Sequence, residues 1–257
     1  MPADSPSVRQ LKSKLRTVQL EGVPYWLAEG DLLLDDKQLQ KYANGGQANN
    51  PPAPEDSPFR LLAQVTEDGR IYRWKPGLEL TYAVIKKSFT QSEYNIVVAN
   101  MKQAASDWGN ACGVKFTHKT LQDDLQSPNE VIFGVRKVDA QGEIIAAAFF
   151  PHDPKDRRHL VIDPSYFTTI FDKVGVLRHE LGHVLGFRHE HIRSGAPPDC
   201  PKESLANTID LSQYDPRSVM HYFCGGVGST ALAITREDLF ASQRLYGPPL
   251  EKVKYVE

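Results

Sequence analysis

The sequence has no apolar run near the roughly 18 residues that a membrane-spanning helix needs, and residues 1–20 lack the apolar core of a secretory signal. It also lacks an excess of one charge, since 30 Lys and Arg residues face 32 Asp and Glu residues. That balance gives no basic field that would favour nucleic acid or an anionic membrane. We therefore expect neither partner, and no export through a general signal peptide. We also expect a monomer.

Cysteine is scarce, with three scattered copies at Cys112, Cys200 and Cys224. They are too few for a disulfide framework, and none stands in a CxxC pair of the kind that binds zinc. Cys200 and Cys224 flank a segment that is expected to fold back beneath the active site described below. A bridge between them and a pair of free buried thiols both remain open.

The chain of 257 residues, 40% of them apolar, is long enough for one sizeable domain with an appendage. Residues 43–58 are rich in Gly, Asn and Pro and have no apolar side chain larger than Ala or Pro, which predicts a flexible linker. The segment before it, 1–42, is too small for a core of its own, so its apolar stretch, 23–34, is expected to pack on the domain that spans 59–250. Residues 251–257 form a tail.

Apolar periodicity predicts an α+β domain with a mixed sheet packed on helices. Apolar positions between Tyr94 and Trp108 recur at helical spacing and indicate a core-facing helix. Thr235, followed three residues later by Asp238, predicts the start of a last helix, which ends at Gly247. Strands are expected at 78–85, 114–117, 130–135, 144–149 and 160–162, and a further helix at 171–186.

The chemical signal is the pattern H-E-x-x-H-x-x-G-x-x-H, which the segment that begins at His179 matches at every fixed position. His179 and His183 stand four residues apart, so on a helix they offer two imidazole nitrogens to one ion. Glu180 lies beside the ion rather than on it. Gly186 permits a left-handed turn that ends the helix, which lets His189 return as a third ligand.

Three histidines leave the fourth position of a zinc ion open to water, whose pKa the ion lowers to about 7. A carboxylate alongside can take the proton as the water attacks a peptide carbonyl, which assigns Glu180 as catalytic base and Zn²⁺ as cofactor. Two alternatives stay open. In one, the histidines only cap a helix or lie on its solvated face. In the other, the zinc is structural and has a fourth protein ligand.

The extended motif resembles that of the metzincin metallopeptidases, and a second landmark agrees with it. Residues 218–222 read S-V-M-H-Y, which is similar to the Met-turn S-x-M-H-Y of the astacin branch. The resemblance implies that Met220 forms an apolar floor beneath the metal and that Tyr222 is a switchable fifth ligand that hydrogen-bonds the oxyanion of the transition state. The alternative is that Met220 is plain core and Tyr222 only packs.

Glu190 and Arg193 match the astacin continuation H-E-x-x-R, whereas residues 195–197 replace the D-R-D expected next. The resemblance implies a metzincin-type catalytic domain, in which a twisted mixed sheet packs on a backing helix and an active-site helix, followed by the Met-turn and a C-terminal helix. It points to an outlying astacin-like group, with a bacterial source as one option.

The run A-A-A-F-F-P resembles the edge strand of the matrixin branch, whose exposed backbone pairs with an extended substrate. This implies a substrate-binding role for Ala146, Ala147 and Ala148. The other ligands of the matrixin structural zinc are missing around His152 and His159, so both are interpreted as surface residues.

Residues 28–31 read A-E-G-D and resemble the F-x-G-D element of astacin propeptides, with Ala28 in place of Phe. In that family the Asp takes the place of water on zinc and keeps the zymogen silent, which implies this role for Asp31. Gly30 would permit the close backbone approach. The alternative is a docked strand or interaction arm that inhibits nothing. Apolar neighbours would anchor the segment, namely Tyr25, Trp26, Leu27 and Leu32.

These expectations describe a zinc-dependent endopeptidase that acts on proteins or peptides and is made in a latent form. The family resemblance implies a secreted or extracellular protein, although no signal peptide is visible. Two other functions stay open, a catalytically silent binding protein that keeps the fold and a protease toxin or effector delivered into another cell. Cleavage specificity does not follow from the sequence.

Overall fold

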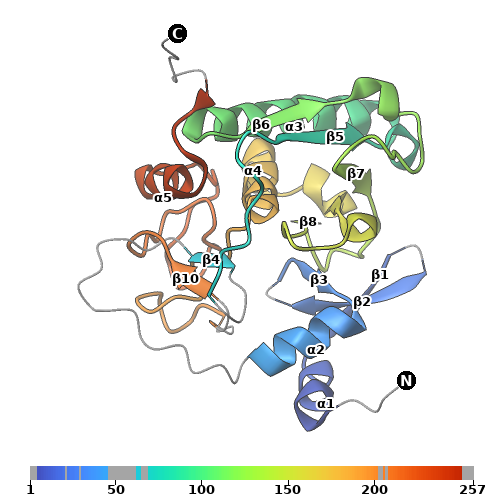
Figure 1. Cartoon of the computed structure of the whole chain (residues 1–257). Helices are drawn as coiled ribbons and strands as arrows, with labels where there is room; N and C mark the ends of the chain where they lie inside the picture. The colour runs from blue at the N-terminus through green and yellow to red at the C-terminus, as the bar shows by residue number, and fades with distance from the viewer. Residues whose placement is uncertain are drawn as a thin grey trace.

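The computed structural model describes residues 5–20, 22–28, 30–45, 62–64, 69–201, 205 and 208–250. At its centre is a sheet of five strands, namely β5 (Glu79–Val84), β6 (Lys115–His118), β7 (Phe133–Lys137), β8 (Ala146–Ala147) and β9 (His159–Ile162). Figure 1 labels β5, β6, β7 and β8, and the order of the whole sheet is β6-β5-β7-β9-β8. Four strands run parallel, and β8 lies antiparallel to β9 at one edge.

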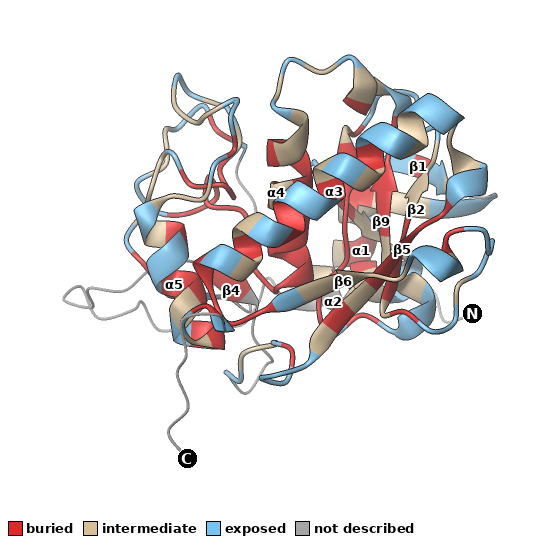
Figure 2. Ribbon diagram, turned by 90° about the horizontal axis from the view of Figure 1, so that it is seen from above, coloured by how far each residue is buried: buried red, intermediate tan, exposed pale blue. Residues whose placement is uncertain are grey.

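Two helices, α3 (Gln91–Ala111) and α4 (Lys173–Val184), pack against each other and share the main core with the sheet. Trp108 is fully buried and donates its indole N–H to the Arg178 carbonyl, which ties the two helices together. In Figure 2 the outer face of α3 is exposed, whereas α4 is buried along most of its length. The predicted α+β fold is confirmed.

Local sequence signals account for the ends of these helices. α3 begins with a capping box between Thr90 and Glu93, and α5 (Arg236–Tyr246) begins with one between Thr235 and Asp238. Gly247, with φ of 76°, follows the end of α5, as the sequence predicts. Four short 3₁₀ helices complete this part of the chain: η1 (Lys86–Ser88), η2 (Thr120–Gln122), η3 (Lys155–Arg157) and η4 (Pro164–Phe167).

The strand expected at 144–149 is only two residues long. Beyond it the chain leaves the ladder and closes a turn. Phe150 donates its backbone N–H to the Asp153 carboxylate at 2.7 Å, and Asp153 donates its own to the Phe150 carbonyl at 2.9 Å. The buried residues between β8 and Phe150 therefore end in a turn that the Asp153 side chain caps, and they do not continue the strand pairing.

The amino-terminal segment adds a layer of its own beside the β8 edge (Figure 1). Its apolar residues share small clusters with the main domain: Val18 and Leu27 pack with Ala147, and Leu32 packs with Phe150. The apolar stretch thus packs on the main domain, as expected. The elements are α1 (Pro6–Lys12), β1 (Arg16–Leu20), β2 (Val23–Ala28), β3 (Leu32–Leu34) and α2 (Asp36–Gly45).

α2 extends to Gly45 and so enters the predicted linker, 43–58, by three residues; positions 46–58 of that linker and the predicted tail, 251–257, lie outside the described residues. Two short strands, β4 (Leu62–Gln64) and β10 (Thr208–Asp210), pair antiparallel. Within the described ranges, no helix is both long and apolar enough to cross a membrane.

Cys200 and Cys224 form a disulfide, with their Cα atoms 5.1 Å apart. Of the two arrangements that the sequence left open for this pair, the structure therefore has the bridge. Cys112 is a free thiol and lies fully buried at the C-terminal end of α3.

Candidate metal centre and active site

His179 and His183 lie one turn apart on α4, and both are buried. The Nδ1 atom of His179 donates to the Val219 carbonyl at 2.7 Å, and that of His183 donates to the Phe187 carbonyl at 2.8 Å. A carbonyl oxygen can only accept, so each Nδ1 carries the proton and each Nε2 keeps a free lone pair. This is the tautomer that a metal ligand needs.

Gly186 turns the chain back just after α4, with φ of 97°. A Cβ at this position would stand 2.7 Å from the Tyr72 carbonyl oxygen, so only glycine fits here without a shift of backbone. The turn returns His189 to the centre, where its Nε2 lies 3.1 Å from that of His183. His189 is fully buried.

Asp31 reaches this centre from the amino-terminal segment. Its Oδ2 lies 3.2 Å from the Nε2 of His179, 3.6 Å from that of His183 and 3.1 Å from that of His189. A tetrahedral ion with bonds of about 2.0–2.1 Å has ligand atoms about 3.3–3.4 Å apart. The four buried side chains thus have the spacing of a zinc coordination shell.

The electrostatics also fit zinc. Burial lowers the pKa of His183 to about 4, which keeps its imidazole neutral and able to bind a cation. Burial raises the pKa of the Asp31 carboxyl, but the histidines around it, His189 and His183 first, outweigh burial, so this pKa lies well below its ordinary value. Three imidazoles and one carboxylate form a donor set that suits zinc.

Glu180 is buried beside this centre and is not one of the four converging groups. Burial, and next the charge of Asp31, raise the pKa of its carboxyl well above the ordinary value. Within the described part of the chain, no donor reaches its Oε2 atom. A buried carboxylate oxygen left without a donor is costly and is typical of a site that exchanges protons.

Met220 lies directly beneath α4, where a Cβ on Gly182 would overlap its sulfur. Asp238 fixes this turn, because it accepts hydrogen bonds from the Ser218 hydroxyl at 2.6 Å and the Val219 N–H at 2.8 Å. The sequence pattern indicated neither the need for a small residue at Gly182 nor the hydrogen bonds of Asp238 to this turn. The motif specifies no residue type at position 182, and Asp238 was recognised only as part of a helix cap.

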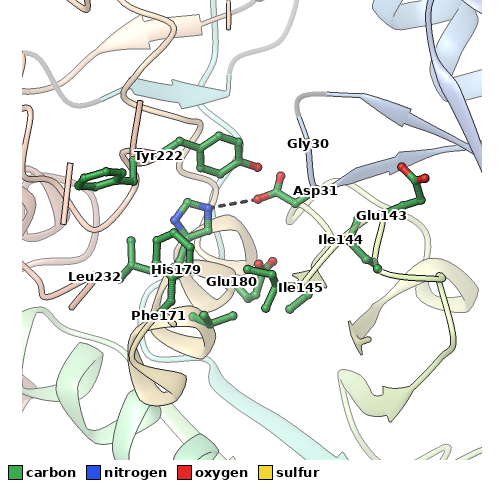
Figure 3. A pocket seen from close by; sticks show the side chains of 14 residues that line it. Gly30, Asp31, Glu143, Ile144, Ile145, Phe171, His179, Glu180, Tyr222 and Leu232 are labelled. Atoms are coloured by element: carbon green, nitrogen blue, oxygen red, sulfur yellow. Dashed lines mark hydrogen bonds and ion pairs between the residues drawn. The ribbon is translucent and has the colours of Figure 1, made fainter. Parts of the chain in front are cut away.

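Tyr222 lies against the same centre. Its ring centroid is 4.5 Å from that of His189 and 4.5 Å from that of His191. In Figure 3 its side chain points toward Asp31. Gly30 approaches the phenol so closely that a Cβ there would stand 2.8 Å from its oxygen. No signal in the sequence had marked His191.

A pocket of about 320 Å³ opens beside Glu180. Of the three predicted substrate-binding alanines, Ala146 lines this pocket, Ala147 packs against the amino-terminal segment, and Ala148 belongs to the main core. Ile144, Ile145, Phe171 and Leu232 form apolar parts of the wall (Figure 3), and Val176 also lines the pocket.

The remaining residues of the motif region play supporting parts. Glu190 and Arg193 form a buried ion pair at 2.6 Å, and Glu190 also accepts the Asp215 N–H at 2.9 Å. Burial raises the pKa of Glu190 to about 8. His152 is exposed and His159 is half-buried, and neither belongs to the metal-binding group.

Comparisons with known proteins agree with this geometry. The matrixin family model matches residues 73–197, a range that includes the three histidines and Glu180 and ends before the Met-turn. The structure of myroilysin is similar, with 17% identity and a TM-score of 0.51 over 68% of this chain and 95% of that chain. At this identity the likeness concerns the fold.

A second solved structure is a hatching enzyme zinc-protease, high choriolytic enzyme 1 of the medaka fish Oryzias latipes. It is 19% identical, with a TM-score of 0.45 over 69% of this chain and 95% of that chain. No curated protein is similar enough to count as a match.

Proposed function

We propose that this metzincin-type metallopeptidase, with zinc as its cofactor, is an astacin-like endopeptidase held latent by its amino-terminal segment. One observation carries the proposal: the Asp31 carboxylate lies among the three Nε2 atoms, where the water of an active enzyme has to stand. The astacin-like assignment is supported by the S-V-M-H-Y turn at 218–222.

Contacts on both sides of Asp31 support a blocking role. Leu27 and Leu32 are buried against the main domain, and a buried side chain of this size contributes about 1.5–3 kcal/mol. Asp35 forms an ion pair with Arg157 at 3.1 Å. While the segment is covalently attached, its effective concentration at the cleft is of millimolar order, so it does not leave by dilution. A cut within 46–58 removes that advantage.

The catalytic roles follow from the positions of the side chains. Bound zinc polarises a water molecule and the substrate carbonyl. In our proposal His179, His183 and His189 hold the ion, and Glu180 takes the proton from the attacking water and passes it to the leaving amine. Tyr222 donates its hydroxyl hydrogen to the developing oxyanion.

Substrate recognition is proposed for β8 and the pocket. β8 is the last strand of its sheet, so an extended peptide can pair with its outer edge. Ala146 on this strand also lines the pocket, next to apolar walls from Phe171, Val176 and Leu232. These walls favour an uncharged, apolar substrate side chain.

The test compares the zinc-loaded full-length chain with its Asp31→Ala variant in a peptide hydrolysis assay without prior cleavage. We expect the variant to be active at once, and the parent to reach the same level only after cleavage between residues 46 and 58. Asp36→Ala is the matched control. Asp36 lies in the same segment but pairs with Lys12 and Trp26, away from the metal.

Equal activity of the parent and both variants before cleavage, with no gain on cleavage, would show that the segment is not an inhibitor. Absence of hydrolysis from every form, with zinc bound, would contradict the peptidase itself.

A further inference from the structure

His191 is a buried histidine to which none of the proposed roles applies, and only 1% of its surface is exposed. Its ring lies face to face with that of Tyr222, with centroids 4.5 Å apart and an interplanar angle of 13°. The other imidazoles near the phenol are placed differently: His189 is tilted by 46°, and the centroid of His179 is 5.8 Å away. Of the three, His191 has the closest parallel stack.

The backbone holds the two partners of this stack in register. The N–H of Glu190, the neighbour of His191, donates to the carbonyl of Met220 at 2.9 Å. Further along both segments, the disulfide between Cys200 and Cys224 links them again. The relative position of His191 and Tyr222 is therefore fixed by covalent and hydrogen-bonded ties on either side of the stack.

The phenol of Tyr222 has a second neighbour, which belongs to the amino-terminal segment. Gly30 approaches the oxygen end of Tyr222, and this contact is lost when the amino-terminal segment leaves the cleft. The face that stacks on His191 then remains supported. A parallel ring lets the phenol slide along its own plane but resists tilting, because tilting breaks the stacked contact.

We propose that His191 is a positioning residue for Tyr222, whose phenol it keeps in the plane that lets the hydroxyl reach the oxyanion. The inference rests on the proposed function, because Tyr222 must act in catalysis for its orientation to matter. A histidine that only fills core volume would be replaced equally well by Leu and by Phe. A positioning residue is replaced well only by a side chain with a flat face.

The first test observes the ring directly. In the zinc-loaded Asp31→Ala chain, 3-fluorotyrosine in place of Tyr222 is followed by fluorine NMR, with His191→Phe and His191→Leu compared. The control is His152→Leu, because exposed His152 is also a stacked histidine, but its partner at 4.3 Å is Tyr72. We expect one sharp signal with Phe and with the control, and a shifted, exchange-broadened signal with Leu. Identical spectra for Leu and Phe would overturn the proposal.

The second test measures peptide hydrolysis in the same Asp31→Ala chain. His191→Leu should lower kcat about 10-fold with little change in KM, the size expected for the loss of one aromatic stack, whereas His191→Phe stays within about 2-fold. When Tyr222→Phe is already present, His191→Leu should have little further effect, because the hydroxyl that it positions is gone.

An equal loss with and without the Tyr222 hydroxyl, or a change mainly in KM, would overturn the positioning role. If the Asp31→Ala chain hydrolyses no peptide, the proposed function fails, and the fluorine signal alone then decides whether His191 orients the ring.

Discussion

Gly30→Ala tests how tightly the amino-terminal segment is fitted to the active site. Gly30 has φ of 86°, and an added Cβ would stand 2.8 Å from both Cε2 and the oxygen of Tyr222. The phenol ring cannot tilt away from the added Cβ, because it is stacked on His191 and lies against His189. We therefore expect the substitution to favour the undocked state of the segment.

Gly22→Ala separates the backbone cost of an alanine at positive φ from the cost of its overlap with Tyr222. Gly22 also has positive φ, 78°, but an added Cβ would meet nothing within 4 Å. Both variants bear the backbone cost of an L-residue in this region, about 1–2 kcal/mol. Only Gly30→Ala adds the overlap with Tyr222, which at overpacked sites costs about 1–3 kcal/mol. This additional cost corresponds to a change of about 5- to 150-fold in the equilibrium between the docked and the undocked segment.

The assay is peptide hydrolysis by the uncleaved, zinc-loaded chains, with protease sensitivity of the segment as a second measure. Gly30→Ala should raise both well above the level of Gly22→Ala. In a Tyr222→Ala background, the excess sensitivity of Gly30→Ala over Gly22→Ala should disappear, because the overlapping ring is absent. An equal effect of the two glycine substitutions in the parent chain would refute the reasoning.

Three further predictions concern the site and its support. Glu180→Gln should keep about one zinc per chain by metal analysis while peptide hydrolysis falls severely, because Glu180 acts as the base and does not bind the ion. Unchanged turnover would show that Glu180 is not the base, and loss of zinc would show that it is a ligand. Tyr222→Phe should lower kcat with little effect on KM or zinc content, whereas a mainly KM effect would indicate substrate packing. Asp238→Ala leaves the buried N–H of Val219 and the N–H of Thr235 without their acceptor. The substitution should lower the free energy of unfolding by about 3 kcal/mol and the Tm in calorimetry by about 6–12 °C. An unchanged Tm would show that these hydrogen bonds do not stabilise the fold.

The sequence predicted those features whose cause is local. The spacing of His179 and His183 follows from helix geometry, the turn at Gly186 follows from a backbone conformation that glycine tolerates, and the start of α5 follows from the pair Thr235 and Asp238. In each case the residues that determine the structure lie within a few positions of one another, so one stretch of sequence contains the whole signal.

Features that depend on distant partners could not be predicted from a local sequence pattern. Gly182 has to be small because Met220, 38 positions later, occupies the space beside it. The bridge between Cys200 and Cys224 could not be decided, because two cysteines reveal nothing of the distance between them in the fold. The stack of His191 on Tyr222 forms only once the Met-turn folds back over His191. Asp31 could be placed near the metal by resemblance alone, since no local pattern links position 31 to position 179.

The central claim is that the main domain is a zinc endopeptidase and that the segment with Asp31 blocks it. Its most direct test is digestion of a peptide library by the wild-type chain before and after cleavage between residues 46 and 58, with a chelator and with zinc restored. We predict little hydrolysis before cleavage, strong hydrolysis afterwards, loss with the chelator and recovery with zinc. Full hydrolysis by the uncleaved chain, or hydrolysis that survives removal of the metal, would contradict the claim.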